Sequence, residues 1–193
     1  MNEFKEIKEK LKIALDESRY EHTLGVMYTA GCMAMAHGYE IRKAMLAGLL
    51  HDCAKCMSHE ERLTLCKEHQ ISVTESELKN KALLHAKAGA ILAKIEYDVI
   101  DEDILHAICV HTTGEADMNM LDKIIYIADY IEPGRDKAPN LETVRSMAYT
   151  DLDACMAQIL SDTLSYLASR GGDIDPTTEL TYQFYKKHQK ERE

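Results

Sequence analysis

The sequence predicts an all-α fold, a single bundle of roughly nine to ten helices in one domain over residues 1–193. Two observations support this prediction. Apolar residues recur at helical spacing along most of the chain, and no segment shows the alternating pattern of a half-buried strand. Capping signals, Pro and Gly then indicate where helices begin and end. We find no internal repeat, no low-complexity tract and no linker long enough to divide domains.

The first three helices are expected within residues 1–50. The opening helix has an apolar face made by Phe4, Ile7, Leu11 and Ala14. A second helix is expected over residues 17–37. Its inner face is expected to hold Leu24, Met27, Gly31 and Met35. Residues 40–50 are mostly apolar, so they predict a short, heavily buried helix that ends at His51 and Asp52.

Two capping boxes mark the next helix starts. Ser58 with Glu61 opens one helix, and Thr74 with Glu77 opens another that is expected to carry His85. Further helices are expected over residues 101–110, 120–131, 141–149 and 151–169, and from Asp175-Pro176 onward. Pro and Gly interrupt residues 132–140 (EPGRDKAPN), which form the clearest loop, and Gly171-Gly172 breaks the pattern before the last helix.

Composition limits the classes of partner. The 193 residues are 46% hydrophobic and 29% charged, as in a globular protein with an ordinary core. A formal net charge of −10 disfavours binding to nucleic acid or to an anionic membrane. The N-terminus lacks a signal-peptide pattern, and the longest apolar run, residues 44–50, is far shorter than a membrane span. We therefore expect a cytoplasmic protein whose six Cys are mostly free thiols.

Four His and two Asp are the candidate metal ligands. In chain order they are His22, His51, Asp52, His85, His111 and Asp129. Their spacing is too wide for a local metal finger, but separate helices of a bundle can bring such residues together in its core. A single His in a helical protein more often has an ordinary hydrogen-bond partner, so the prediction depends on the ordered set. His37, His59, His69, His106 and His188 are given no role.

Cations accompany this set. Arg19 lies one turn before His22, and Lys55 lies one turn after Asp52, whereas Gly25 leaves space beside His22. With Arg135, these cations could bind phosphate oxygens, a necessary feature if an acidic protein handles a phosphorylated substrate. Ordinary surface cations are the alternative. Two carboxylates, Asp122 and Glu132, could orient ligand histidines as hydrogen-bond acceptors.

Cys53 and Cys56 form a rival motif. With His59, Cys66 and His69 they could indicate zinc or redox chemistry. No second CxxC exists, however, and the pair is interleaved with His51-Asp52. Since a reduced Cys commonly behaves as a small hydrophobic residue, this is the weaker interpretation.

The chain resembles the HD superfamily of metal-dependent phosphohydrolases. The order H…HD…D is filled by His22, His51-Asp52 and Asp129, and HDCAK (residues 51–55) is similar to an HDxxK motif. The added pair His85 and His111 resembles variants that hold two metals. Three further segments resemble the YqeK-type symmetrical dinucleoside tetraphosphatases: RYEHTLGV (19–26), HTTG (111–114) and DKIIYIADYIEPGR (122–135). The resemblance extends over residues 12–185, with DKAPN (136–140) less typical.

This resemblance implies hydrolysis of diadenosine tetraphosphate at its central phosphoanhydride, giving two ADP, by a di-iron centre in an all-helical fold. One metal would be held by His22, His51, Asp52 and Asp129. The other would be held by His85, His111 and a bridging Asp52. Asp52 and Lys55 would be catalytic, and the substrate would be bound by Arg19, His22, Lys55, His85 and Arg135. A homodimer is one option for the oligomeric state, which the sequence leaves open.

The residue types agree with that chemistry independently. Phosphoanhydride oxygens repel a nucleophile, and two metals can neutralise this charge and hold a bridging hydroxide at neutral pH. Imidazole and carboxylate ligands suit iron, manganese, zinc or nickel. Two alternatives stay open at this point: a phosphohydrolase of the same superfamily acting on another nucleotide, and a metal-stabilised module that senses nucleotides without turnover.

Overall fold

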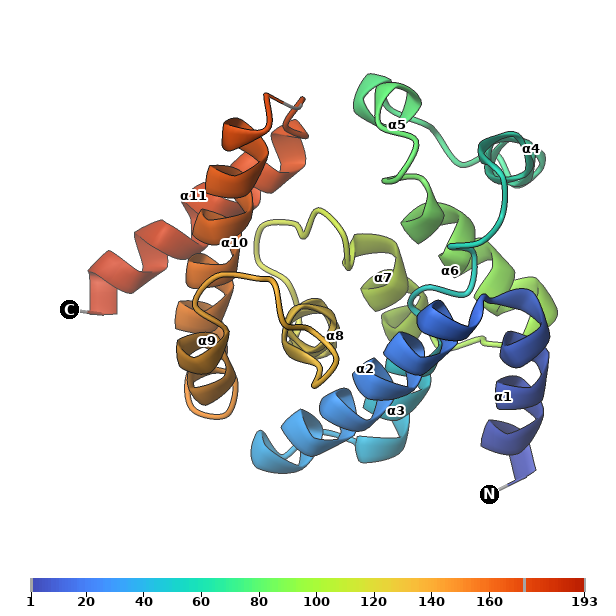
Figure 1. The fold of residues 1–193 in the computed structure, drawn as a ribbon, viewed down its shortest axis with the longest axis horizontal. Coiled ribbons are helices and arrows are strands. Elements are labelled where there is room, and N and C mark those ends of the chain that lie inside the picture. The colour runs from blue at the N-terminus through green and yellow to red at the C-terminus, as the bar shows by residue number, and fades with distance from the viewer. Residues whose placement is uncertain (1, 172, 193) are drawn as a thin grey trace.

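A computed structural model describes the backbone of residues 2–171 and 173–192, and the side chains of residues 4–171 and 173–189. All regular secondary structure in these ranges is helical (Figure 1). The eleven helices are α1 (Asn2–Ala14), α2 (Glu17–Ala36), α3 (Ile41–Leu50), α4 (His59–Glu68), α5 (Glu75–Lys79), α6 (His85–Glu96), α7 (Glu102–Val110), α8 (Met120–Ile131), α9 (Leu141–Met147), α10 (Leu152–Ser169) and α11 (Pro176–Arg192). The predicted all-α class is confirmed. Gly172, one of the two expected helix breakers, lies outside the described residues.

The described part of the chain has one helix more than the sequence predicts, because two helices, α5 and α6, form where a single helix was expected. The capping box of Thr74 and Glu77 is present and opens α5, but the backbone leaves the helical region at Asn80 (φ −98°, ψ 87°). The side chain of Asn80 accepts a hydrogen bond from the Ala82 amide at 3.1 Å and so stabilises a turn. His85 therefore begins a new helix, α6, instead of lying within the one that starts at Glu75.

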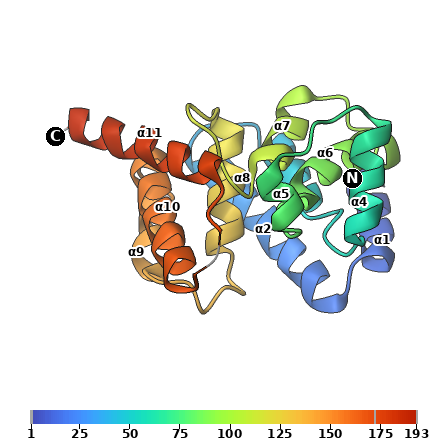
Figure 2. The same ribbon diagram turned by 90° about the horizontal axis from the view of Figure 1, so that it is seen from above.

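Helix α8 lies in the middle of the molecule (Figures 1 and 2). It packs against α2, α3 and α7 on one side and against α9 and α10 on the other. The large side chains Leu121, Ile124, Ile125 and Ile127 of α8 are fully buried. Helix α2 pairs extensively with α3, and α10 with α11. Because α8 is surrounded by other helices, Asp129 in its last turn lies next to α2 and α3 and is only partly exposed.

The expected inner face of α2 is partly wrong. Met27 and Gly31 are buried, but Leu24 is only half-buried and Met35 is 60% exposed. The buried side is completed by Val26, Ala30, Met33 and Ala34. Since α2 carries apolar residues nearly all round, its periodicity could not define which side α3 and α8 cover.

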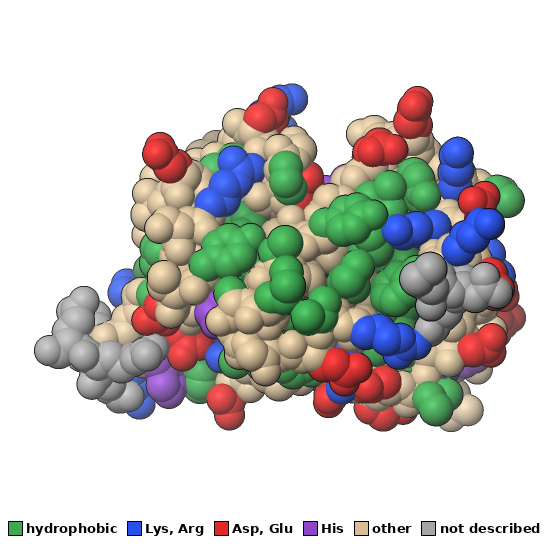
Figure 3. All heavy atoms as spheres, turned by 90° about the horizontal axis from the view of Figure 1, so that it is seen from below, with side chains coloured by type: hydrophobic (Ala, Val, Ile, Leu, Met, Phe, Trp, Pro, Cys, Tyr) green, Lys and Arg blue, Asp and Glu red, His purple; other side chains and the backbone are tan. Residues whose placement is uncertain are grey.

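Apolar side chains also reach the surface. Figure 3 shows hydrophobic groups gathered across the middle of one face of the molecule. Exposed large hydrophobic residues of the chain include Tyr28, Met35 and Ile41. Among the described residues, no helix combines the length and the apolar character needed to cross a bilayer.

Candidate metal centre

The six expected ligands converge on one point from five helices and the turns that follow them. His22 is on α2, His51 caps the C-terminus of α3 with Asp52 next to it, His85 begins α6, His111 caps α7, and Asp129 is in the last turn of α8. Four of them are almost completely buried: His51, Asp52, His85 and His111. Residues up to 107 positions apart in the sequence therefore form one cluster.

Asp52 is at the centre of the cluster. Its Oδ2 lies 3.9 Å from His22 Nε2 and 3.5 Å from His51 Nε2. Its Oδ1 lies 2.9 Å from His85 Nε2 and 3.6 Å from His111 Nε2. The two carboxylate oxygens thus face two different pairs of imidazoles, an arrangement in which one carboxylate could bridge two cations.

Asp129 joins the first of these pairs. Its Oδ1 lies 2.9 Å from His22 Nε2 and 3.8 Å from His51 Nε2. Within this cluster, two groups of residues have their ligand atoms within 4.8 Å of one another and could each hold a metal ion: His22, His51 and Asp129, and His51, Asp52 and His111. In the pair of imidazoles that faces Asp52 Oδ1, His85 Nε2 lies 3.0 Å from His111 Nε2.

Each histidine has its other ring nitrogen engaged away from the centre. In three cases the acceptor is the backbone carbonyl three residues earlier: Gly48 for His51, Ala82 for His85 and Ile108 for His111. For His22 the acceptor is Glu132, whose Oε1 lies 3.0 Å from Nδ1. A proton on Nδ1 leaves the Nε2 lone pair directed into the cluster, which is the tautomer that ligates a metal.

These residues fit a metal centre. His22 Nε2, His51 Nε2 and Asp52 Oδ1 are buried without a hydrogen-bond partner among the described residues, although other ligand atoms lie within 4 Å. Nitrogens and oxygens whose lone pairs converge repel one another, and buried polar atoms are otherwise almost always satisfied. Cations held between these atoms would accept their lone pairs and so satisfy all three. The donors are imidazole and carboxylate, with no thiolate, which suits first-row transition metals better than a structural zinc site.

The electrostatics keep both carboxylates and His85 in the forms that bind a metal. Burial would raise the pKa of Asp52, but the facing imidazoles of His51 and His111 outweigh it and hold that pKa well below its usual value. Burial lowers the pKa of His85 to about 4, so that the ring is neutral at pH 7. For Asp129, His22 and neighbouring positive charge likewise outweigh burial and lower the pKa. Carboxylates that are ionised and imidazoles that are neutral are the forms that ligate metals.

The three expected cations lie at the edge of the cluster. Arg19 Nη1 is 2.7 Å from Asp52 Oδ2, and Arg135 Nη2 is 2.6 Å from Asp129 Oδ1. Lys55 Nζ is 3.1 Å from His85 Nε2, and burial lowers the pKa of this amine. All three are partly exposed, so each can reach a ligand that approaches from solvent while it contacts a carboxylate of the cluster.

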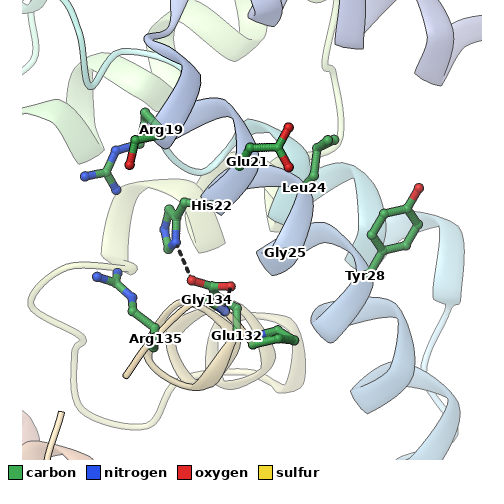
Figure 4. A pocket seen from close by; sticks show the side chains of 11 residues that line it. Arg19, Glu21, His22, Leu24, Gly25, Tyr28, Glu132, Gly134 and Arg135 are labelled. Carbon is green, nitrogen blue, oxygen red and sulfur yellow. Dashed lines mark hydrogen bonds and ion pairs between the residues drawn. The ribbon is translucent and has the colours of Figure 1, made fainter. Parts of the chain in front are cut away.

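Of the two carboxylates expected to orient ligand histidines, only Glu132 does so (Figure 4). It is 4% exposed and also accepts the Gly134 amide at 2.6 Å. A Cβ on Gly25 would lie 2.5 Å from Glu132 Oε2, so the absence of a side chain there makes room for this carboxylate. The expected space beside His22 is therefore occupied by Glu132.

The prediction that Asp122 orients a ligand histidine is wrong. Asp122 accepts hydrogen bonds from His106 Nδ1 and from the Asn119 amide, each at 3.0 Å. The physical reason is its position in the first turn of α8, where it completes a capping box, nearly two turns from Asp129. His106, which was given no role, also contacts Glu115 at 3.0 Å. The sequence signal for this cluster is the Asn119–Asp122 capping box, which brings the carboxylate to the N-terminus of α8.

The cysteine alternative gains no support. Cys53 is buried with its Sγ 3.4 Å from the Gly89 carbonyl, whereas Cys56 is exposed and contacts Asp16. Among the described residues, the groups that could hold a metal contain no Cys. Thr112, which the sequence argument did not single out, has its Oγ1 3.3 Å from His111 Nε2, and its place in the HTTG segment was the available signal.

Two cavities reach the cluster. The larger, about 610 Å³, is lined by Arg19, His22, Gly25, Glu132 and Arg135, among others (Figure 4). The second, about 160 Å³, is lined by Lys55, His85, His111, Asp129 and neighbouring tyrosines. His22 therefore borders one cavity, while the other histidine pair borders the second.

The family follows from comparison with known proteins. The HD domain model matches residues 19–134, a range that includes all six ligands, so the chain belongs to the HD domain family and is a hydrolase of that type. A solved structure, described as a predicted HD superfamily hydrolase involved in NAD metabolism from Clostridium acetobutylicum, is 37% identical with a TM-score of 0.92. It covers 96% of this chain and 97% of its own.

Three relatives that are similar over most of their length share one more specific name. The chain is 42% identical over 172 residues to a protein of Halalkalibacterium halodurans named bis(5'-nucleosyl)-tetraphosphatase, symmetrical, covering 89% of this chain and 91% of that one. Proteins of the same name from Bacillus subtilis and Staphylococcus aureus are 40% and 38% identical, covering 90% and 82% of this chain and 92% and 82% of their own lengths.

Proposed function

We propose that this protein hydrolyses diadenosine tetraphosphate at its central phosphoanhydride and releases two ADP. The observation that carries the proposal is the buried Asp52, whose two oxygens face two separate pairs of imidazoles with cations on either side. Relatives similar over most of their length and named symmetrical tetraphosphatases support the choice of substrate. The name of the Clostridium structure adds NAD to the compounds worth testing.

The proposed cofactor is a pair of metal ions, iron first and manganese or another transition metal next. His22, His51, Asp52 and Asp129 would hold one ion, and Asp52, His85 and His111 the other. When bound, two such ions supply charge neutralisation for phosphate oxygens and a water nucleophile at neutral pH, the bridging hydroxide expected from the sequence.

The residues of the chain bind and orient the polyphosphate. Arg19 and Arg135 line the larger cavity and present guanidinium groups, which suit paired phosphate oxygens. Lys55 presents a compact positive charge at the smaller cavity. His22 and His85 border the two cavities and would contact substrate there. A polyphosphate that crosses the cluster with one nucleoside on each side would present its central linkage to Asp52, which supports symmetrical cleavage.

The test is product analysis. Purified protein is incubated with diadenosine tetraphosphate and Fe²⁺ or Mn²⁺, and wild type is compared with Asp52→Ala and with Asp173→Ala, an exposed control. Metal-dependent formation of ADP alone, lost only in Asp52→Ala, is the expected result. AMP plus ATP would overturn the symmetrical mechanism. Turnover of another nucleotide or of NAD, or binding without turnover, would favour the alternative hydrolase or the sensing module.

The remaining predictions accompany this function. We propose a small-molecule partner and no nucleic acid, one functional domain over residues 1–193, a cytoplasmic location and a homodimer. The acidic net charge supports the first, and the apolar face in Figure 3 supports the last. Light scattering on eluting protein distinguishes monomer from dimer, and a filter-binding assay with RNA tests the exclusion of nucleic acid.

A further inference from the structure

Arg62 is a buried arginine that binds backbone instead of a carboxylate. It lies on α4 and is 8% exposed. Its Nε donates to the Ala54 carbonyl at 3.1 Å, Nη1 to Lys81 at 3.1 Å and Nη2 to Lys55 at 2.5 Å. Among the described residues, no carboxylate lies within ion-pair distance of this guanidinium. Three separate carbonyls thus share one rigid planar donor.

The three carbonyls belong to the two turns that flank one half of the centre. Ala54 and Lys55 are the second and third residues after Asp52, so Arg62 fixes the backbone from which the Lys55 side chain extends. Lys81 precedes Ala82, whose carbonyl accepts from His85 Nδ1. A single side chain outside the cluster therefore connects the segment of the amine with the segment that orients His85.

Arg145 makes the corresponding contacts on the other half. It lies on α9, next to the fully buried Val144. Its Nε donates to the Ile131 carbonyl at 3.0 Å, and its Nη2 donates to Glu132 at 3.1 Å and to Arg135 at 2.8 Å. These carbonyls belong to the end of α8 and to the loop that carries both Glu132 and the guanidinium of Arg135.

The guanidinium is suited to this task because its donors are held in a fixed fork, whereas an ammonium is a single point on a flexible stem. Donation to several carbonyls restricts the backbone of loops that otherwise lack regular structure. The cations that meet the substrate gain a defined position, and a displacement of about 1 Å in a positioned group can lower a rate by about a hundredfold.

We propose that Arg62 and Arg145 are positioning residues: Arg62 sets Lys55 and His85, and Arg145 sets Glu132 and Arg135. Neither reaches the cavities, so neither is expected to contact substrate. The kinetic measurements that test this proposal rest on the proposed function, whereas the measurements of tripolyphosphate binding do not.

The experiment is a crossed set of double-mutant cycles. Arg62→Met and Arg145→Met are each combined with Lys55→Ala and with Arg135→Ala, and kcat and KM are measured for diadenosine tetraphosphate. Each positioning variant alone is expected to lower kcat/KM by about 10–100-fold. Arg62→Met should lower kcat/KM by a smaller factor in Lys55→Ala than in wild type, because the part of its effect that acts through Lys55 is already lost there. It should act in full on Arg135→Ala, because coupled residues are non-additive and independent ones are additive.

Arg145→Met should show the reverse pattern, with a smaller loss in Arg135→Ala than in wild type and its full loss in Lys55→Ala. Additive losses in all four combinations would overturn the proposal, since a general loss of stability does not select one cation over another. Arg170→Met, an exposed arginine stacked near Tyr166, removes one guanidinium and should leave kcat and KM unchanged.

Folding is controlled separately. Thermal unfolding is recorded for every variant, and Arg62→Lys and Arg145→Lys replace any Met variant that does not fold, because lysine keeps the charge but not the fork. The same four combinations are measured for binding of inorganic tripolyphosphate to Mn²⁺-treated protein by calorimetry. If wild type does not hydrolyse the dinucleotide, the proposed function fails, while selective coupling in the binding arm still supports positioning and additive coupling still refutes it.

Discussion

Replacing Gly25 by alanine should favour helix α2 but displace Glu132, the carboxylate that orients His22. The new Cβ would lie 2.5 Å from Glu132 Oε2 and 3.2 Å from its Cδ. Non-bonded atoms prefer a separation of about 3.5 Å, so the carboxylate would have to move by roughly 1 Å. That movement would disturb its contacts with His22 Nδ1 at 3.0 Å and with the Gly134 amide at 2.6 Å.

The sizes of these two effects decide whether Gly25→Ala raises or lowers the free energy of unfolding. Alanine in a helix interior is more favourable than glycine by about 1 kcal/mol. A hydrogen bond to a charged group contributes about 1.5–3 kcal/mol, and Glu132 is buried, so one lost bond exceeds the gain. We expect Gly25→Ala to lower the free energy of unfolding by roughly 0.5–2 kcal/mol, the difference between these two effects. Loss of the acceptor for His22 is expected to weaken metal binding by about 10–100-fold.

The assay pairs urea denaturation in EDTA with Mn²⁺ titration and turnover. Gly31→Ala is the matched control on the same helix, because its Cβ would meet Met45 Cγ at 2.9 Å, the middle of a flexible side chain that can adopt another rotamer. The control should bind metal as wild type does. The reasoning is refuted if Gly25→Ala matches Gly31→Ala in metal affinity and turnover, since Glu132 would then not need the space.

Three further predictions follow from the site and its surroundings. Asp52→Asn should lower kcat by at least about 10³-fold while the protein stays folded, as measured by product release and circular dichroism, because the amide cannot bridge two cations; activity within tenfold of wild type would contradict the bridging role. His106 has a raised pKa because Asp122 and Glu115 outweigh its burial, so its stabilisation is present below about pH 6.5 and is lost as pH rises through the folded pKa. The difference in unfolding free energy between wild type and His106→Gln should therefore be larger at about pH 6 than at about pH 9, and a difference independent of pH would be inconsistent with that charge. Cys53→Ala and Cys56→Ser should each keep turnover within about threefold of wild type, since neither thiol reaches the cluster, and a loss as large as that of Asp52→Asn would restore the thiol hypothesis.

Metal removal gives a measurement that does not depend on turnover. With metal at about 100 times its Kd, folding should gain about 2.7 kcal/mol relative to EDTA-treated protein, because a ligand that binds only the folded state stabilises it. The check is the urea midpoint with and without Mn²⁺, with Asp52→Asn as the variant in which the shift should shrink. An equal shift in both proteins would place the stabilising ion elsewhere.

Much of the helical architecture was accessible from the sequence because it depends on neighbours along the chain. The capping boxes at Ser58 and Thr74 are formed as predicted, since each involves residues three positions apart. The break at Asn80 is equally local, but it depends on a side chain bonding its own backbone, which competes with a strong helical pattern and is hard to weigh beforehand. The six candidate ligands were selected by their order and motifs, and the structure brings them together.

Other features depended on which surfaces meet. Apolar residues surround α2, so the sequence could not say that Met35 would be exposed while Met33 was buried. Glu132 orients His22 across 110 positions of sequence, whereas Asp122, in the first turn of α8, faces His106. The carbonyl contacts of Arg62 and Arg145 have no motif at all. Periodicity and capping are set by residues within about one turn, and the sequence by itself determined those; which helix faces pack together, and which distant donors and acceptors then meet, is decided only when the whole chain buries its apolar surface.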